Sequence, residues 1–173
     1  NANYGRTLHI QHHRVIPAIW RRLSLIADSL PPDAVRDLEI SARSNAVRSA
    51  LMLEELQRAA ALLDSHGIPH LCFKGPVMSF QLYGDAAMRQ SADIDLLVPA
   101  DRLIAARRVM LEHEYRPYLE MNDAELELFL EGGWGCGLVH KSSQIFLDLD
   151  TGVTPHCFCS TLNAEHLWPR RQS

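Results

Sequence analysis

The sequence predicts an α+β fold in which a small mixed β-sheet is flanked by helices, with further helices at the N-terminus. Two observations predict it. As far as Gly67, apolar residues recur at three- and four-residue steps, which is helical periodicity. Beyond Gly67 they gather in short runs bounded by turn residues, which is typical of strands. A chain of 173 residues is long enough to bury a core of its own.

The sequence before Gly67 predicts two helices. The apolar stripe over residues 8–30 predicts the first, and Pro17 indicates a kink or a late start in it. The Pro31-Pro32 pair ends this helix, and Asp33 can cap a second, longer one. Gly67 stands where a left-handed C-terminal cap is expected, so the second helix should end just before it.

The rest of the chain alternates between predicted strands and helices. Asn122 and Glu125, three residues apart, form a capping-box pattern that marks one helix start. In chain order the pattern predicts a strand over 68–73, a helix over 76–83, a strand over 93–98, a helix over 101–114 capped by Asp101, a strand over 115–119, a helix from Asn122 to Gly132-Gly133, a hairpin of 134–140 with 144–150, and a short helix containing 164–168.

Composition and charge narrow the class of protein. Seventeen basic residues against 21 acidic ones give a net charge of −4, which argues against an extensive nucleic-acid footprint. Apolar stretches are far shorter than the roughly 20 residues that cross a bilayer, and nothing resembles a signal peptide. Four cysteines are too few for a disulfide scaffold in a chain of this length. We expect a cytoplasmic protein with no membrane partner.

Two Asp-x-Asp pairs, Asp93 with Asp95 and Asp148 with Asp150, lie within apolar runs that favour strands. Alternate residues of a strand share a face, so each pair presents two carboxylates side by side. A buried carboxylate without a partner costs several kcal/mol, so a positive group should meet them. Hard divalent cations, Mg²⁺ above all, take such oxygen ligands.

A phosphate-binding turn is the second candidate feature. The strand predicted over 68–73 ends at Lys74-Gly75, where a helix begins, about twenty residues before the first acidic pair. The N–H groups of a helix N-terminus suit an anion, and Lys74 adds a point charge. Lys74 is one of only two lysines, the other being Lys141. The alternative is that Lys74 neutralises one of the acids in a purely structural role.

These motifs together resemble the signature of a known family. The resemblance is carried by Phe73-Lys74-Gly75-Pro76, Tyr83, Arg89 and Asp93-Ile94-Asp95-Leu96-Leu97-Val98. The run resembles that of the uncharacterised nucleotidyltransferase family within the DNA-polymerase-β-like superfamily, and the likeness extends more loosely to Asp148. It implies a polymerase-β-like nucleotidyltransferase core.

The resemblance implies a metal-dependent reaction. Asp93 and Asp95 would be the first two metal ligands and Asp148 the third. Mg²⁺ or Mn²⁺ ions would bridge the phosphates of a nucleoside triphosphate such as ATP. A nucleoside monophosphate would pass to an acceptor hydroxyl, releasing pyrophosphate, while Lys74, the Gly75 backbone and Arg89 would hold phosphate oxygens.

The sequence departs from the superfamily pattern at one place and from the pattern of this branch at another. Lys74-Gly75 stands where the wider superfamily has Gly-Ser; the other members of this branch also have Lys-Gly there. Asp150 stands where the branch often has His, two residues after the third acid. Because Asp148 and Asp150 share a face, either can be the third ligand.

The domain prediction follows from these features. We expect residues 1–32 to form a helical segment packed on a nucleotidyltransferase-like core of residues 33–173. The family usually continues into further helices, so we expect this chain to be truncated at its C-terminus.

Several alternatives stay open. The acceptor can be a small molecule, a protein or tRNA, and the sequence specifies neither nucleobase nor oligomeric state. A second hypothesis is a catalytically inactive nucleotide-binding or protein-interaction module of the same fold. A third, weaker one is a toxin or antitoxin that modifies tRNA or protein.

Three further clusters are weak candidates for chemistry. His9, His12 and His13 lie at helical spacing but have no evident third zinc ligand. His156-Cys157-Phe158-Cys159 lacks the usual two-residue spacing of zinc sites. Cys136 lies between Gly135 and Gly137, where glycines indicate a bulge or a close backbone approach rather than the turn of a nucleophile.

Overall fold

The computed structural model describes residues 14–131 and 135–153. The chain divides into two compact units, the first made of residues 1–53 and 74–92 and the second of residues 54–73 and 93–173. Helix α3, Pro32–Ser65, contributes residues to both. The division into a segment 1–32 and a core 33–173 stays a prediction.

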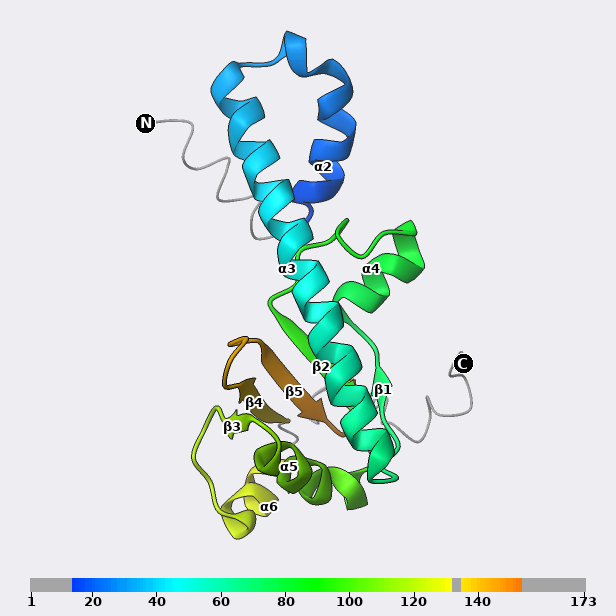
Figure 1. Cartoon of the computed structure of the whole chain (residues 1–173), viewed down its shortest axis with the longest axis vertical. Helices are drawn as coiled ribbons and strands as arrows, with labels where there is room; N and C mark the ends of the chain where they lie inside the picture. Colours follow the sequence, from blue (N-terminus) through cyan, green and yellow to red (C-terminus); the bar gives the residue numbers. More distant parts are fainter. Residues whose placement is uncertain (1–13, 132–134, 154–173) are drawn as a thin grey trace. The chain divides into compact units, whose positions relative to one another are not determined.

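The first unit is helical. It contains α2 (Ile16–Leu23), the 3₁₀ helix η1 (Ser24–Ser29), the first part of α3, and α4 (Gly75–Tyr83), as Figure 1 shows. The helix predicted over 8–30 is therefore two segments, with non-helical dihedral angles at Ile26. Pro17 lies in the first turn of α2, where its missing N–H costs no hydrogen bond, so the late start is confirmed. Residues 8–13 of that prediction lie outside the described residues.

The end of α3 confirms the predicted glycine cap. Gly67 has a φ of +63°. Its N–H donates to the Asp64 carbonyl at 2.9 Å, and the Ile68 N–H donates to the Leu63 carbonyl at 3.0 Å. This pair of bonds is the Schellman arrangement, which satisfies carbonyls at the helix end and needs a left-handed residue at the position of Gly67.

The second unit is built on a five-stranded mixed sheet, so the predicted α+β class is confirmed. The strand order is β1-β2-β5-β4-β3, and only the β2–β5 pair is parallel. The strands are β1 (Leu71–Cys72), β2 (Asp93–Leu97), β3 (Tyr115–Pro117), β4 (Cys136–His140) and β5 (Phe146–Asp150); the helices are η2 (Ala100–Arg102), α5 (Leu103–Glu112) and α6 (Asp123–Glu131).

One face of this sheet lies in the apolar core. On β5, Leu147 and Leu149 are fully buried while the alternate residues are only half-buried. The core also includes Ile94, Leu96, Leu103, Ala106, Met110, Leu126 and Leu138. Burial of a leucine-sized side chain contributes about 1.5–3 kcal/mol, so this face fixes the sheet against its helices.

The local predictions in this unit are mostly confirmed. The hairpin exists, with β4 and β5 antiparallel. The capping box of α6 is formed: the Glu125 N–H donates to Asn122 Oδ1 at 3.0 Å, and the Asn122 N–H donates to Glu125 Oε2 at 2.8 Å. The helix predicted to contain 164–168 lies outside the described residues.

Proline is involved in three of the differences between this unit and the sequence prediction. The strand predicted over 68–73 is only Leu71–Cys72, since Pro69 has no N–H to donate to a ladder. The strand predicted over 115–119 ends at Pro117, although the Tyr118 N–H still donates to the Gly137 carbonyl of β4 at 2.9 Å. Asp101 does not cap α5. Pro99 begins a 3₁₀ turn before it, and Asp101 instead pairs with Arg102 at 3.6 Å.

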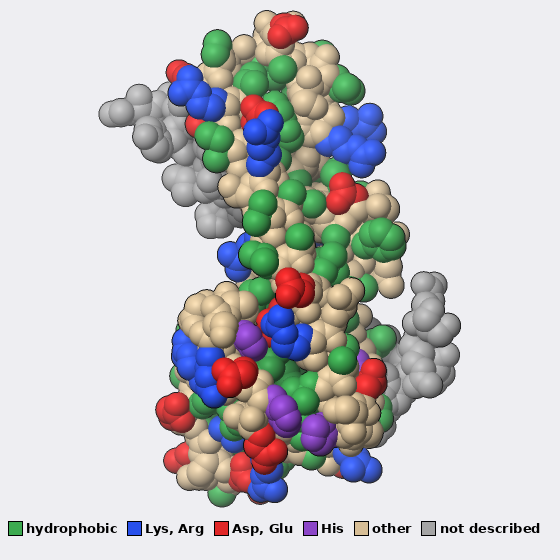
Figure 2. Space-filling model, in the orientation of Figure 1, with side chains coloured by type: hydrophobic (Ala, Val, Ile, Leu, Met, Phe, Trp, Pro, Cys, Tyr) green, Lys and Arg blue, Asp and Glu red, His purple; other side chains and the backbone are tan. Residues whose placement is uncertain are grey.

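The surface carries charges of both signs. In Figure 2, Lys and Arg side chains are interspersed with Asp and Glu side chains on the face drawn. Within residues 14–131 and 135–153, none of the helices is long and apolar enough to cross a bilayer.

A buried carboxylate joins three elements of the second unit. The Glu55 side chain, on α3, is 1% exposed. It accepts hydrogen bonds from the Tyr115 hydroxyl on β3 and, at 3.2 Å, from Ser143 Oγ in the turn between β4 and β5. Arg58 Nη1 lies 2.5 Å away and supplies the counter-charge. Burial, with Glu55 adding to it, raises the pKa of Tyr115, so this phenol stays a donor.

Glu55→Ala should therefore destabilise the fold by about 3–5 kcal/mol, because it breaks a buried ion pair and leaves the Tyr115 hydroxyl without its acceptor. Glu54→Ala is the matched control: Glu54 precedes Glu55, also pairs with Arg58 at 3.1 Å, and has a side chain that is 67% exposed. The control should change stability by no more than about 0.5 kcal/mol. Urea unfolding followed by circular dichroism measures both, and equal losses would contradict the role given to Glu55.

Candidate functional site

The four aspartates lie on two neighbouring parallel strands of the second unit. Asp95 of β2 is directly opposite Asp148 of β5 in the register. Neighbouring strands are about 4.8 Å apart, so the α-carbons of these two residues are separated by about that distance. Asp93 lies two residues earlier on the same face, about 6.6 Å along the strand. The register therefore places three carboxylate-bearing residues on one face of the sheet, of which Asp95 and Asp148 are directly opposite each other.

The environment of these aspartates is partly apolar. Asp95 is 6% exposed and lies between Ile94 and Leu96, both buried. Asp93 and Asp148 are half-buried. A carboxylate in such surroundings interacts with a cation more strongly than it does in water, because the local dielectric constant is lower.

Asp150 differs from Asp148 in what surrounds it. It is opposite Leu97, which is fully buried, rather than opposite another acid. Its carboxylate lies against Gly135, where an added β-carbon would be 2.0 Å from Asp150 Oδ1 and 3.0 Å from the Leu149 carbonyl. Asp150 is thus held close to the residue that precedes β4, and only a glycine leaves room for it.

Gly135→Ala should destabilise the fold by about 1–3 kcal/mol, because the Asp150 side chain must move to admit the methyl group. In an Asp150→Ala background the obstructing oxygen is absent, so Gly135→Ala should lower the free energy of unfolding by less. The coupling energy between the two substitutions should be at least about 0.5 kcal/mol. Urea unfolding of the four proteins in this double-mutant cycle measures the coupling, and strict additivity would rule out the contact.

The donor chemistry at these strands fits a hard divalent ion. All the candidate ligands are carboxylate oxygens, which Mg²⁺ and Mn²⁺ prefer. Within the described residues, no group of three or more His, Cys, Asp or Glu side chains is gathered closely enough to hold a metal ion. The strands offer instead the facing pair Asp95 and Asp148. Mg²⁺ is commonly held by one or two carboxylates, with the remaining positions taken by water and substrate phosphates.

The predicted phosphate turn lies in the first unit and has the expected local form. Lys74 is extended and immediately precedes α4. Gly75 is the first helical residue and has a φ of +64°, a conformation that a side chain would strain. Pro76 follows in the first turn, where proline is favoured. The N-terminal N–H groups of α4 thus follow directly after the Lys74 side chain.

Arg89 lies in the loop after α4, whose backbone is anchored in two ways. The Arg89 N–H donates to Ser79 Oγ at 3.1 Å, and this hydroxyl, fully buried, donates to the Asp85 carbonyl at 2.8 Å. From α3, Asn45 Nδ2 donates to the Ala87 carbonyl at 2.8 Å. Asn45 and Ser79 were not singled out from the sequence, because a polar residue within a helix gives no signal of the loop it contacts.

Cys136, on β4, is unsuited to be a nucleophile. It is 1% exposed, and burial raises the pKa of its thiol to about 11; Arg107 opposes this shift and Asp148 adds to it. The close backbone approach predicted from the flanking glycines is confirmed at Gly135, where an added β-carbon would lie 3.0 Å from the Leu149 carbonyl; at Gly137 the group that approaches is the Phe146 ring, at 2.7 Å. The clusters at 9–13 and 156–159 lie outside the described residues.

The raised pKa of Cys136 sets a pH dependence of stability. In the unfolded chain the thiol ionises near 9.0, whereas in the folded protein it stays protonated up to about 11. The protonated thiol therefore contributes fully to the free energy of unfolding below pH 9. This contribution, about 2–3 kcal/mol in total, is lost as the pH rises towards 11. The wild type should lose stability relative to Cys136→Ala across this interval in urea unfolding. A constant difference between pH 7 and 11 would refute the assignment.

Comparison with known proteins identifies the class. The sequence matches, over residues 8–173, the family described as "Uncharacterised nucleotidyltransferase". The match covers nearly the whole chain, so the protein belongs to this family and its class is that of the nucleotidyltransferases. The family resemblance read from Phe73 to Val98 is confirmed. None of the curated proteins matches the sequence.

Among solved structures, the chain is similar to the antibiotic-resistance factor ANT(2'')-Ia in solution, with 16% identity and a TM-score of 0.46. The similarity covers 68% of this chain and 54% of that one, so the chain spans about half the length of that structure.

Proposed function

We propose that the protein transfers a nucleoside monophosphate from a nucleoside triphosphate to an acceptor hydroxyl and releases pyrophosphate, with Asp93, Asp95 and Asp148 as ligands of Mg²⁺ or Mn²⁺. The observation that carries the proposal is the register of β2 with β5, which sets Asp95 opposite Asp148 with Asp93 on the same face. Membership of the nucleotidyltransferase family supports the reaction class.

Divalent ions held by Asp93, Asp95 and Asp148 would supply charge neutralisation of the triphosphate and activation of the acceptor hydroxyl. The chain's contribution is positional. Asp95 lies on a strand whose neighbouring residues are buried, so its backbone is fixed by core packing. Asp148 is held opposite it by the parallel ladder. Little covalent work falls to side chains in such a reaction, because positioning and charge neutralisation provide most of the rate enhancement.

The family resemblance assigns the phosphate contacts to Lys74, Gly75 and Arg89. The conformation of Gly75 at the start of α4 supports a backbone contact with an anionic oxygen. Lys74 adds a point charge and Arg89 a planar donor fork, which pairs with two phosphate oxygens at once. The anchored backbone around Arg89 limits the backbone entropy that this loop would lose on binding.

The register also favours Asp148 over Asp150 as the third carboxylate ligand. Asp148 faces Asp95, whereas Asp150 faces Leu97 and rests against Gly135. The acceptor, whether a small molecule, a protein or tRNA, must bring a hydroxyl to the bound triphosphate. The net charge of −4 disfavours an acceptor that needs a long basic footprint.

Transfer of label from α-³²P nucleoside triphosphates to a panel of acceptors, with Mg²⁺ or Mn²⁺, tests the proposal. Asp93→Asn, Asp95→Asn and Asp148→Asn should each lower the rate by about 100- to 1,000-fold or more, because each removes an anionic ligand worth several kcal/mol of transition-state stabilisation. Asp101→Asn is the matched control, since that side chain is 78% exposed and lies outside the site. Asp150→Asn should retain most of the activity.

Full activity in the Asp95→Asn protein, with an unchanged circular dichroism spectrum, would refute the mechanism. Loss of activity in Asp150→Asn but not in Asp148→Asn would exchange the roles of these two residues. Metal-dependent binding of triphosphate by the full-length protein without any product would favour the inactive nucleotide-binding module instead.

A further inference from the structure

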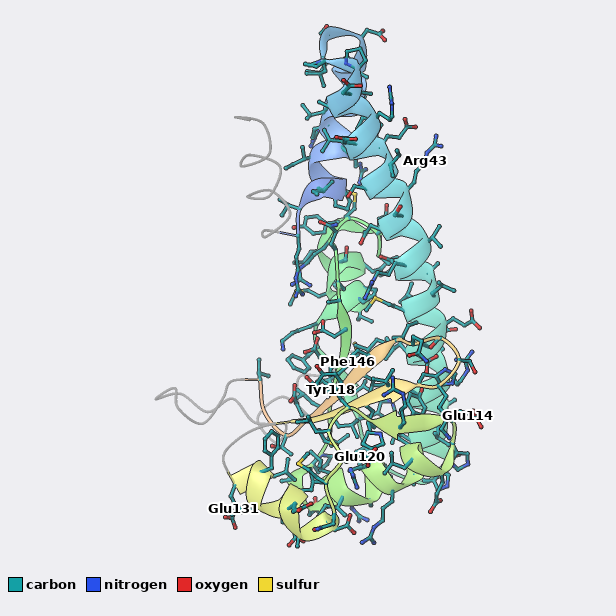
Figure 3. The ribbon with its side chains drawn as sticks, turned by 90° about the vertical axis from the view of Figure 1, so that its left-hand side faces the viewer. Arg43, Glu114, Tyr118, Glu120, Glu131 and Phe146 are labelled. Carbon is teal, nitrogen blue, oxygen red and sulfur yellow. The ribbon has the colours of Figure 1, made fainter. Side chains whose placement is uncertain are left out.

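Two aromatic side chains lie beside the aspartates on the same face of the sheet. Phe146 is opposite Asp93 in the β2–β5 register and precedes Asp148 by two residues. Because strand residues alternate between faces, Phe146 shares the face of Asp148. The Tyr118 ring packs edge-to-face on Phe146, with centroids 5.1 Å apart and an interplanar angle of 84° (Figure 3). The mechanism proposed above uses neither side chain.

The backbone fixes the position of this aromatic pair. The Tyr118 N–H donates to the Gly137 carbonyl at 2.9 Å, which holds the residue just after β3 against β4. A β-carbon on Gly137 would lie 2.7 Å from Phe146 Cζ and 3.2 Å from Tyr118 Cβ. Gly137 thus leaves the room that the Phe146 ring and the Tyr118 β-carbon occupy.

The pair also exposes aromatic surface. Tyr118 is 62% exposed, and Phe146 is half-buried. In an edge-to-face pair only one of the two rings has its face covered by the other, so aromatic face remains open on the second. An exposed aromatic surface next to carboxylates is suited to a ligand that has a flat ring at one end and binds metal at the other.

We propose that Tyr118 and Phe146 form a stacking platform for the nucleobase of the triphosphate. This inference rests on the proposed function. Standard strand spacings separate the α-carbon of Phe146 from that of Asp93, across the ladder, by about 4.8 Å and from that of Asp148, along the strand, by about 6.6 Å. A nucleotide separates its base from its α-phosphate by one sugar, so a base on the platform leaves the phosphates near the aspartates.

The chemistry of the platform also defines its selectivity. Stacking on an aromatic ring tolerates every base, because each has a π-face, and discrimination among bases comes mainly from hydrogen bonds. The platform therefore contributes affinity for a nucleoside triphosphate in general. Binding of adenine, guanine, cytosine and uracil nucleotides should depend on Tyr118 to a similar degree.

The test compares two ligands that differ only in carrying a nucleoside. The full chain is titrated, in the presence of Mg²⁺, with ATP and with inorganic triphosphate. Tyr118→Ala should weaken ATP binding by about 5- to 150-fold, which is the usual effect of removing one stacked aromatic ring. Binding of inorganic triphosphate should be unchanged. Tyr118→Phe, which keeps the ring, and Leu119→Ala, which truncates the adjacent 51%-exposed side chain, should both bind ATP as the wild type does.

Equal ATP affinity in Tyr118→Ala and wild type would overturn the platform while leaving the proposed function intact. A parallel loss of ATP and inorganic triphosphate would also overturn it, because the base would then have no part in the effect. A raised KM for the acceptor with unchanged ATP binding would assign the rings to the acceptor and refute the nucleobase assignment. If the wild type binds neither ligand with Mg²⁺, the proposed function itself fails.

Discussion

The parallel pairing of β2 with β5 is the constraint on which the candidate site depends. Ile94 and Leu96 on one strand, and Leu147 and Leu149 on the other, are all buried on the core side of the sheet. A slip of one residue in either strand would exchange its two faces, burying aspartates in the core and exposing leucines. The packing of these apolar side chains therefore decides where the carboxylates lie, and the acids take the positions that the core leaves for them. The site is in this sense a product of the hydrophobic register rather than of attraction between its own groups.

Sequence reasoning predicted what depends on nearby residues. The capping box of Asn122, the glycine cap at Gly67 and the shared face of each aspartate pair all follow from spacings of a few residues, and the family signature from Phe73 to Val98 is equally local. The register between β2 and β5 could not be predicted in this way. It is set by packing between segments far apart in the chain, so the different surroundings of Asp148 and Asp150 emerged only from the structure. Pro69 delays the start of one strand, because a hydrophobic run does not show which N–H groups a ladder needs, and the strand predicted over 115–119 is also shorter than its apolar content indicated.

The residues that sequence reasoning missed share a physical property: their importance lies in a contact with a distant segment. Tyr118 lies in a stretch predicted as a strand and Phe146 in an apolar run, so neither gives a signal of function; only the fold packs one ring against the other beside the aspartates. Ser79 likewise sits within α4 and gains its role from the loop that carries Arg89. Gly135 and Gly137 are a partial exception. Their alternation around Cys136 indicated a close approach, and the structure identifies the Asp150 carboxylate and the Phe146 ring as the groups that approach them.

The β2–β5 ladder also has a kinetic consequence. The β4–β5 hairpin joins strands separated by a short turn, whereas Asp95 and Asp148 are about 50 residues apart in the chain. Closing so long a loop costs conformational entropy that is recovered only when the ladder and its apolar face have formed, and topologies rich in such distant pairings fold slowly. During synthesis, Asp93 and Asp95 emerge well before the strand that completes their site. For that interval the nascent chain would carry only half of the proposed metal site, so the order in which the segments are made would delay the proposed activity until β5 is in place.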